Sequence, residues 1–343
     1  MTSHELFSVD YFEARKRFLN EADTLGLTVE TIVHPLESDP QGDIAIDVIR
    51  IGPTKTERLL FVLSGVHGTE INAGSAVQLG LLRDYAGKVP DNTAIVLIHA
   101  VNPVGCARLT RYDENNVDPN RNVRDFSQPL PENPEYDLMH SALCPIEWTG
   151  PVREKADADI QSYIDSKGMD SFTQNVLQGQ HSHPDGIFFG GTEQIWCVKQ
   201  LIEIMTRHAD GASKVSLIDV HTGIGPRGFG QIIRAGDAQP DGAEWGKIGG
   251  MISDIVDMIP SAESKIKILI EFGTHEFETV IAAHRADNWL RRRGDRNSPE
   301  GLEIRKNLHD ALFVDQADWC QSIWEQSRRL TTDVLNEMSQ HGI

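Results

Sequence analysis

The chain has 343 residues, 39% hydrophobic and 24% charged, a composition typical of a globular protein with a sizeable core. Its 51 acidic residues outnumber the 32 basic ones and give a net charge of −19, which argues against nucleic acid or an anionic membrane as a partner. Four scattered cysteines form no C-x-x-C pair, so the sequence indicates neither a disulfide framework nor a cysteine-type zinc site.

The N-terminal segment lacks the apolar core of a signal peptide. No stretch approaches the roughly 18 apolar residues of a membrane span. We therefore expect a cytoplasmic protein that does not enter a membrane.

Predicted helices and strands alternate along the first hundred residues. Aromatic and leucine positions at helical spacing predict a helix over 8–24, and the Ala/Leu-rich stretch after Glu70 predicts another over 72–85. Apolar and alternating runs predict four strands, at 28–35, 44–51, 59–64 and 93–101.

The pattern breaks down between residues 102 and 195, where Asn, Pro, Asp and Gly are frequent and one helix is predicted at 153–167. Long irregular segments in compact domains are usually functional or disordered. Regular order then returns, with strands predicted at 214–220 and 266–272 and helices at 196–208, 245–258, 275–292, 301–310 and 315–338.

These elements predict an α/β fold with a central mixed, mostly parallel twisted sheet flanked by helices. Because no repeat, low-complexity tract or linker is visible, we expect residues 1–343 to form a single domain. It would have an irregular insert on the active face at about 102–195 and a helical C-terminal segment at about 275–338.

Three apolar strands each end in residues suited to metal binding or acid–base chemistry. LLFVLSGVHGTE places His67 and Glu70 at one strand end, VSLIDVHTG places His221 at the second, and IKILIEFGT places Glu271 at the third. Open α/β sheets bind ligands at the carboxyl ends of their strands, so these side chains are expected to converge.

Two neutral imidazoles and one carboxylate, here His67, His221 and Glu70, form a three-ligand zinc set that leaves one position open, as a hydrolytic site requires. A separate carboxylate must then take a proton from the attacking water. Glu271 is the candidate, because it ends a different strand.

Several short motifs resemble the zinc carboxypeptidase superfamily, nearer to its aspartoacylase and succinylglutamate desuccinylase branch. They occur in the family's order over about 60–275: H-G-T-E at 67–70, N-P-V-G at 102–105, T-R-Y at 110–112, D-P-N-R-N at 118–122, D-V-H at 219–221 and E-F-G at 271–273. The resemblance implies the phosphorylase/hydrolase-like fold of that superfamily and a single Zn²⁺ in each chain.

The same resemblance implies a role for each site residue. The metal ligands correspond to His67, Glu70 and His221, and the general base corresponds to Glu271. Arg111 would polarise the scissile carbonyl and stabilise its oxyanion. The pair Asn120 and Arg121 would clamp a substrate carboxylate, a task suited to a planar guanidinium.

The sequence departs from both branches of the superfamily. Carboxypeptidases have a catalytic-site tyrosine shortly before the base glutamate, yet residues 237–270 contain no tyrosine. The aspartoacylase branch adds a small C-terminal β domain, whereas helices are predicted at that end of this chain.

We therefore expect a zinc-dependent hydrolase that cleaves an amide or peptide bond next to a carboxylate, in a small molecule or short peptide. The choice between exopeptidase and N-acyl-amino-acid deacylase stays open, and the sequence leaves the oligomeric state undetermined. The alternative is a non-catalytic zinc- or carboxylate-binding protein on the same scaffold.

Further signals have more than one interpretation. Asp118 either accepts a hydrogen bond from a ligand histidine or is an ordinary turn residue before a proline. GIGPRG at 223–228 matches a dinucleotide-binding fingerprint, but the following residues do not look helical, so we expect a loop.

The His- and Gly-rich segment 178–191 could form a substrate wall, a second metal site or a plain packed loop. The histidines interpreted as structural or surface residues are His34, His99, His208 and His284.

Overall fold

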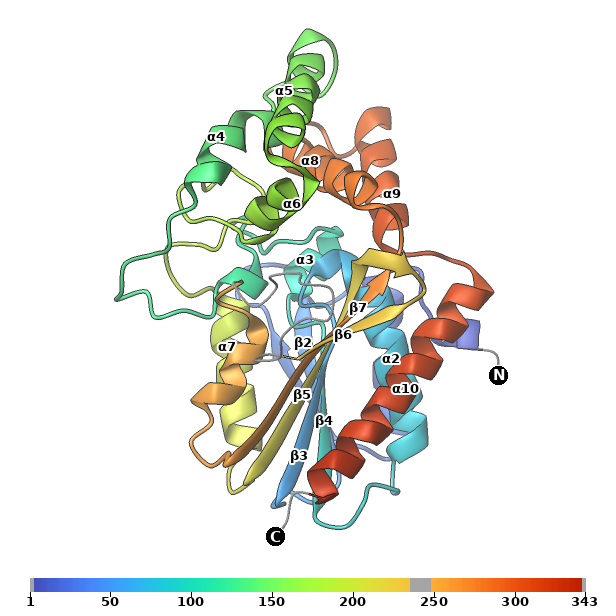
Figure 1. Cartoon of the computed structure of the whole chain (residues 1–343). Coiled ribbons are helices and arrows are strands. Elements are labelled where there is room, and N and C mark those ends of the chain that lie inside the picture. The colour runs from blue at the N-terminus through green and yellow to red at the C-terminus, as the bar shows by residue number, and fades with distance from the viewer. Residues whose placement is uncertain (1–2, 235–247, 341–343) are drawn as a thin grey trace.

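The computed structural model describes residues 3–234 and 248–340 (Figure 1). Within them one sheet has the strand order β1-β2-β4-β3-β5-β7-β6. Strands β4, β3, β5 and β7 run parallel, whereas β1, β2 and β6 pair antiparallel with their neighbours. The predicted mixed, mostly parallel α/β sheet is confirmed. The strand bounds are β1 (Val29–Val33), β2 (Ala45–Ile51), β3 (Arg58–Leu63), β4 (Thr93–His99), β5 (Lys214–Arg227), β6 (Gly230–Arg234) and β7 (Ser264–Gly273).

Helices cover both faces of this sheet and gather beyond the carboxyl ends of its parallel strands (Figure 1). The α-helices are α1 (Tyr11–Thr24), α2 (Ile71–Tyr85), α3 (Pro103–Arg108), α4 (Pro134–Leu143), α5 (Pro151–Lys167), α6 (Met169–Leu177), α7 (Trp196–His208), α8 (Phe277–Arg293), α9 (Pro299–Leu312) and α10 (Ala317–Gln340). Short 3₁₀ turns are η1 (Ser3–Leu6), η2 (Gly68–Glu70), η3 (Pro119–Arg121) and η5 (Ile252–Met258).

Strand β3 lies at the centre of the sheet and is buried on both faces, as its continuous apolar run predicts. Leu60 and Val62 belong to the core shared with α1, α2 and α10. Leu59 and Phe61 belong to the opposite core, shared with α7 and η5. This two-sided burial fixes the position of the end of β3, and therefore of the residues that follow it.

The segment 102–195 contains four α-helices, α3 to α6, so the expectation of a largely irregular insert with one helix was wrong. Proline near the first helical position begins three of them. Asn102 caps α3, and the Asn133 side chain accepts a hydrogen bond from the Tyr136 amide to cap α4. Asn-Pro therefore marks helix starts here, because proline's fixed φ suits the first turn and its missing N–H is not needed there.

Two further expectations need correction. GIGPRG does not form a simple loop, because β5 continues to Arg227 with a bulge between Gly223 and Arg227. The antiparallel strand β6 follows instead of a helix, which removes the dinucleotide-binding interpretation. Residues 245–247 of the helix predicted over 245–258 lie outside the described residues, and its later part forms only the 3₁₀ turn η5.

The other predicted helices and strands agree with the structure to within a few residues at their ends. In the part of the chain that is described, no helix combines the length and the apolar character needed to cross a membrane.

Candidate metal centre and its pocket

His67 and Glu70 lie on the tight turn that joins β3 to α2. The turn η2 begins directly after His67, and Glu70 is the residue before α2. A Cβ added to Gly68 would fall 1.9 Å from the carbonyl carbon of Gly105 in α3, so only glycine fits between these segments. This close approach holds both side chains above the end of β3.

His221 reaches the same point from the neighbouring strand β5. Its Nδ1 lies 3.1 Å from Nδ1 of His67 and 2.9 Å from Oε2 of Glu70. The other carboxylate oxygen, Oε1, lies 2.9 Å from Nδ1 of His67. All three side chains are buried, and together they could hold a metal ion. Adjacent ligands of a tetrahedral zinc ion lie about 3.4 Å apart, so this donor set needs little adjustment to accept one.

A carboxylate lies close to the far nitrogen of each imidazole. Nε2 of His67 lies 3.2 Å from Oδ1 of Asp118, and Nε2 of His221 lies 2.7 Å from Oδ2 of Asp219. Such contacts leave the Nδ1 lone pairs directed at the common point, which is the usual arrangement behind metal-binding histidines. Both interpretations of Asp118 apply: its side chain contacts a candidate ligand, and it also accepts a hydrogen bond from the Asn120 amide at 2.9 Å at the start of η3.

Glu70 remains ionised in this setting. Burial opposes its charge, but the adjacent imidazoles of His67 and His221 lower the pKa of the carboxyl overall. The Thr222 amide also donates to Oε2 over 3.2 Å. A buried carboxylate fixed between two imidazoles is a suitable ligand for a divalent cation.

Arg111 lies beside this cluster and is tied to it through Asp118. Its Nε donates to Oδ2 of Asp118 over 2.8 Å, and Nη1 lies 3.7 Å from Oε1 of Glu70. The guanidinium carbon lies 4.8 Å from the ring centre of Phe188, within range of a cation–π interaction. Asp118 therefore orients both a candidate ligand and a positive group that lines the same pocket.

Arg121 and Asn120 also line the pocket. Nε and Nη2 of Arg121 donate to the Leu177 carbonyl, and Nη1 donates to the Asn120 carbonyl at 2.7 Å. The Asn120 side-chain oxygen accepts from the Ile252 amide at 2.8 Å. Among the described residues no carboxylate forms an ion pair with Arg121, and burial lowers the pKa of its guanidinium to about 10.

Glu271 enters the pocket from β7, where it is directly opposite His221 in the sheet register. The Ile224 amide donates to its Oε1 over 3.1 Å. Gly223, with φ +151°, passes so close that an added Cβ would lie 3.2 Å from the same oxygen. Burial, followed by the negative charge of Glu70, raises the pKa of Glu271 to about 7.

The structure thus brings every candidate site residue to one pocket. Sequence reasoning did not single out the other residues of its wall, and Phe188 and His284 are the two of them that bear most on the chemistry. Phe188 comes from the segment 178–191, which agrees with the substrate-wall interpretation of that loop. His284 lies on α8, is buried and lines the pocket, so it is not a surface residue. The signal in the sequence was weak, because one histidine within a helix has no distinctive spacing.

Two other groups of metal-binding residue types occur among the described residues. His140, His183 and Asp185 form one, but the imidazoles stack with centroids 3.8 Å apart and an interplanar angle of 13°. The in-plane lone pairs of parallel rings do not meet at one ion. Nε2 of His183 also lies 2.8 Å from Oδ1 of Asp137, which gives that ring an ordinary partner.

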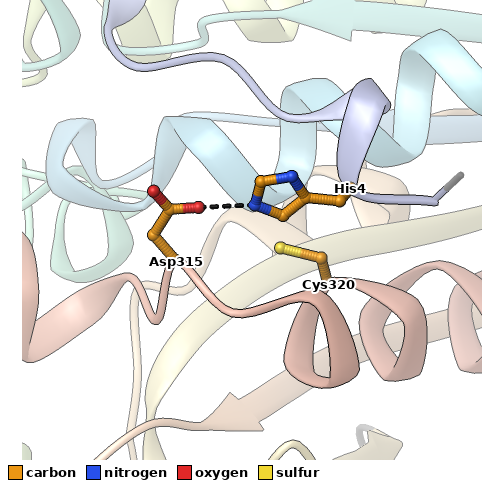
Figure 2. Close-up of side chains that lie close together, drawn as sticks. All are labelled: His4, Asp315 and Cys320. Carbon is orange, nitrogen blue, oxygen red and sulfur yellow. Dashed lines mark hydrogen bonds and ion pairs between the residues drawn. The ribbon is translucent and has the colours of Figure 1, made fainter.

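The second group joins η1 to the start of α10 (Figure 2). Nε2 of His4 lies 2.7 Å from Oδ1 of Asp315, and the Cys320 thiol lies beside them. His4 and Asp315 are exposed to solvent, so their contact is an ordinary surface pair. Burial raises the pKa of the Cys320 thiol to about 12, which disfavours the thiolate that a metal would need.

Several solved structures can be superposed on much of this chain. One is a proposed metallopeptidase from Shewanella amazonensis, with 12% identity, coverage of 81% of this chain and 91% of the other, and a TM-score of 0.43. Another is bovine thrombin-activatable fibrinolysis inhibitor in complex with tick carboxypeptidase inhibitor, with 13% identity, 95% and 99% coverage, and a TM-score of 0.42. A third is succinylglutamate desuccinylase from Chromobacterium violaceum, with 15% identity, 87% and 74% coverage, and a TM-score of 0.36.

No curated protein matches the chain. One family does match, over residues 7–248 and 242–326, and its description is "Protein of unknown function (DUF2817)". The chain belongs to this family.

Proposed function

We propose that the protein is a zinc-dependent hydrolase that cleaves an amide or peptide bond adjacent to a substrate carboxylate. One observation carries the proposal: His67, Glu70 and His221 converge on a single point, and Glu271 enters the same pocket from the next strand. A zinc ion at that point would supply a Lewis acid and lower the pKa of a water molecule to about 7.

The two pocket glutamates differ in a way that suggests separate tasks. Both oxygens of Glu70 face imidazole nitrogens, so this carboxylate is placed to bind the metal. Glu271 stands outside that group of three and accepts only a backbone amide bond from Ile224 among the described residues. With a pKa of about 7, it can take a proton from the attacking water and return it to the leaving amine near neutral pH.

Arg111 is placed to stabilise negative charge that develops on the substrate. Its Nε is held by Asp118, while the rest of the guanidinium lines the pocket close to Glu70. Positive groups fixed in advance beside a developing oxyanion lower the barrier, because they need no rearrangement during the reaction. We propose that Arg111 donates hydrogen bonds to the scissile carbonyl oxygen of the substrate.

Arg121 and Asn120 are the proposed carboxylate clamp. Arg121 is buried and positively charged, and it forms no ion pair with a carboxylate of the described residues. Among the described residues, backbone carbonyls accept from three of its five N–H groups, which leaves two for a ligand. A substrate carboxylate would supply the missing countercharge, which is the reason to expect the cleaved bond beside an acid group.

The test is a screen of zinc-loaded protein against N-acyl amino acids and dipeptides. We expect hydrolysis of at least one class, loss of that activity with a chelator, and its return when zinc is added back. Glu271→Gln is the control, because it keeps the metal ligands. Tight binding of these acids by protein that never hydrolyses them would contradict the proposal and favour a carboxylate-binding protein instead.

A further inference from the structure

One face of α8 is polar although it is buried. His284, Asp287, Asn288 and Arg291 follow each other at helical spacing, so they lie along one side of the helix. The first three are buried, and Arg291 is largely so. Buried polar side chains normally have hydrogen-bond partners, so each of these four positions calls for one.

Three of the four bind one another or the loops that form the pocket wall. Asp287 accepts a hydrogen bond from the Thr110 hydroxyl at 2.6 Å, next to Arg111 in the sequence. Asn288 donates to the Asp185 carbonyl at 2.8 Å, in the segment that bears Phe188. Arg291 donates to Asp287 at 2.9 Å. These contacts hold α8 against both loops and fix the position of His284, the fourth polar residue of this face.

His284 is that fourth residue. Its side chain lines the pocket together with Arg111 and the metal-binding triad, yet only 2% of the residue is exposed. Nδ1 has no hydrogen-bond partner in the described part of the chain. The ring meets Phe188 edge-on, with centroids 6.0 Å apart. The fold therefore brings a polar group to the pocket, and residues 3–234 and 248–340 supply no partner for this nitrogen.

The imidazole is uncharged in this position. Burial, followed by the positive charge of Arg111, lowers the pKa of His284 to about 3. A neutral imidazole offers one N–H donor and one acceptor nitrogen. It is not one of the three groups that converge on the metal position, so a metal held there would leave the hydrogen-bonding capacity of the imidazole free.

We propose that His284 contacts the substrate and hydrogen-bonds an uncharged polar group of it, of the amide or hydroxyl class. This inference rests on the proposed function and adds a second recognition element to it. Phe188, Val280 and Ile281 are apolar residues of the same wall, and a neutral imidazole among them suits an uncharged polar partner. The substrate would thus present its carboxylate to Arg121 and a neutral polar group to His284.

Binding is measured by calorimetry in a Glu271→Gln background, so that turnover does not interfere. The zinc-loaded protein is titrated with the N-acyl amino acids and dipeptides of the screen. His284→Phe, which keeps a ring but removes both nitrogens, should weaken binding by about 5- to 100-fold, because it leaves a polar substrate group without a partner. His284→Asn, which keeps a donor and an acceptor, should stay within a few-fold of the parent, and zinc content should not change.

A matched control uses His99, a second buried histidine whose Nδ1 also lacks a partner among the described residues. Its ring stacks on Phe18, with centroids 4.7 Å apart, and does not line the pocket. His99→Gln should lower the melting temperature without changing ligand affinity. This separates loss of a buried imidazole from loss of a substrate contact.

A second test changes the ligand, and its first arm uses only protein that has His284. Replacing the amide or hydroxyl group of the tightest ligand by a methylene or methyl group should weaken binding to protein that has His284, and should matter little to His284→Phe. Two results would overturn the role of His284 and leave the proposed function intact. In the first, the parent protein binds the original and the altered ligand equally well. In the second, the parent protein and His284→Phe bind the original ligand equally well. Loss of zinc in both variants would overturn that role too, by making His284 structural. Absence of both binding and turnover in native protein would defeat the two proposals together.

Discussion

The floor and the roof of the pocket are built differently. We call floor the residues at the strand ends, His67, Glu70, His221 and Glu271, and roof the residues supplied by loops and α8, Arg111, Arg121, Phe188 and His284. Floor residues take their positions from the ends of strands: His221 lies directly opposite Glu271 in the register, and His67 and Glu70 lie on the turn that follows β3. Roof residues take theirs from side-chain and carbonyl contacts, such as Arg121 on Leu177.

This difference separates chemistry from recognition. The floor contains the groups that can hold a metal and move a proton. Their positions are fixed by the buried sheet. The roof contains the groups placed to bind substrate, on segments whose sequences can change without disturbing the sheet. Changes in the floor should therefore affect the rate or the metal. Changes in the roof should affect substrate binding, except at Arg111, which is proposed to stabilise the oxyanion and should affect the rate as well.

The largest effect on rate is expected from Glu271→Gln. This change keeps the shape of the side chain but removes its ability to accept a proton, so kcat should fall by about 10²–10⁴ while zinc content and substrate affinity remain near native. Because the base must be deprotonated, the native rate should fall as pH drops through about 7 or somewhat below, since a bound cation stabilises the carboxylate. Unchanged turnover would remove Glu271 from the mechanism, and loss of zinc would make it a ligand.

A roof change should show the opposite pattern. Arg121→Ala should raise KM for an acid substrate by about 10- to 150-fold, as expected for a lost hydrogen bond to a charged group, with a smaller change in kcat. Amidating the substrate carboxylate should weaken binding to the native protein by a similar factor and to Arg121→Ala hardly at all. A native protein that cleaves acid and amide equally well would contradict the clamp.

The carboxylates behind the floor should tune metal affinity. Asp118→Asn and Asp219→Asn should each weaken zinc binding by about 10- to 100-fold, because they no longer orient the imidazoles of His67 and His221 as charged acceptors. Competition with a chromogenic chelator measures this. If both variants bound zinc as tightly as the native protein, the two carboxylates would not contribute to metal binding.

The smallest effect concerns the backbone beside Glu271. Gly223→Ala should lower kcat by roughly tenfold, because the new Cβ crowds Oε1 of Glu271 and displaces the base. Gly225→Ala is the matched control: its φ is also positive, at +116°, but the nearest atom to an added Cβ lies 3.9 Å away, on Gly273. Both variants should lose stability, and only Gly223→Ala should lose rate. Equal rates would mean that Gly223 does not position Glu271.

The floor could be predicted from sequence because two short-range rules were enough. A buried apolar run predicts a strand, and parallel strands bring their carboxyl ends to one edge. His67, His221 and Glu271 each follow such a run, so their convergence needed no knowledge of the loops. Arg111 and Arg121 were found only through the family resemblance, because no local pattern shows where a loop arginine points.

The rest of the roof could not be predicted because it depends on long-range contacts. His284 reaches the pocket only because Asp287 and Asn288 bind loops more than a hundred residues away in sequence. The helices between residues 102 and 195 are a different case. Their start signals, Asn102 and Asn133 each before a proline, were visible but were interpreted as loop composition.

Metal content measured on matched histidine variants tests the central claim most directly. Elemental analysis of zinc-loaded protein should find one zinc per chain, because three protein ligands are enough to hold one catalytic zinc ion. His67→Ala and His221→Ala should lose that zinc and all activity. His4→Ala and His183→Ala, from the two other groups of ligand-type residues, should keep both. Zinc retained in His67→Ala and His221→Ala, or lost in His4→Ala or His183→Ala, would contradict the assignment of the metal centre.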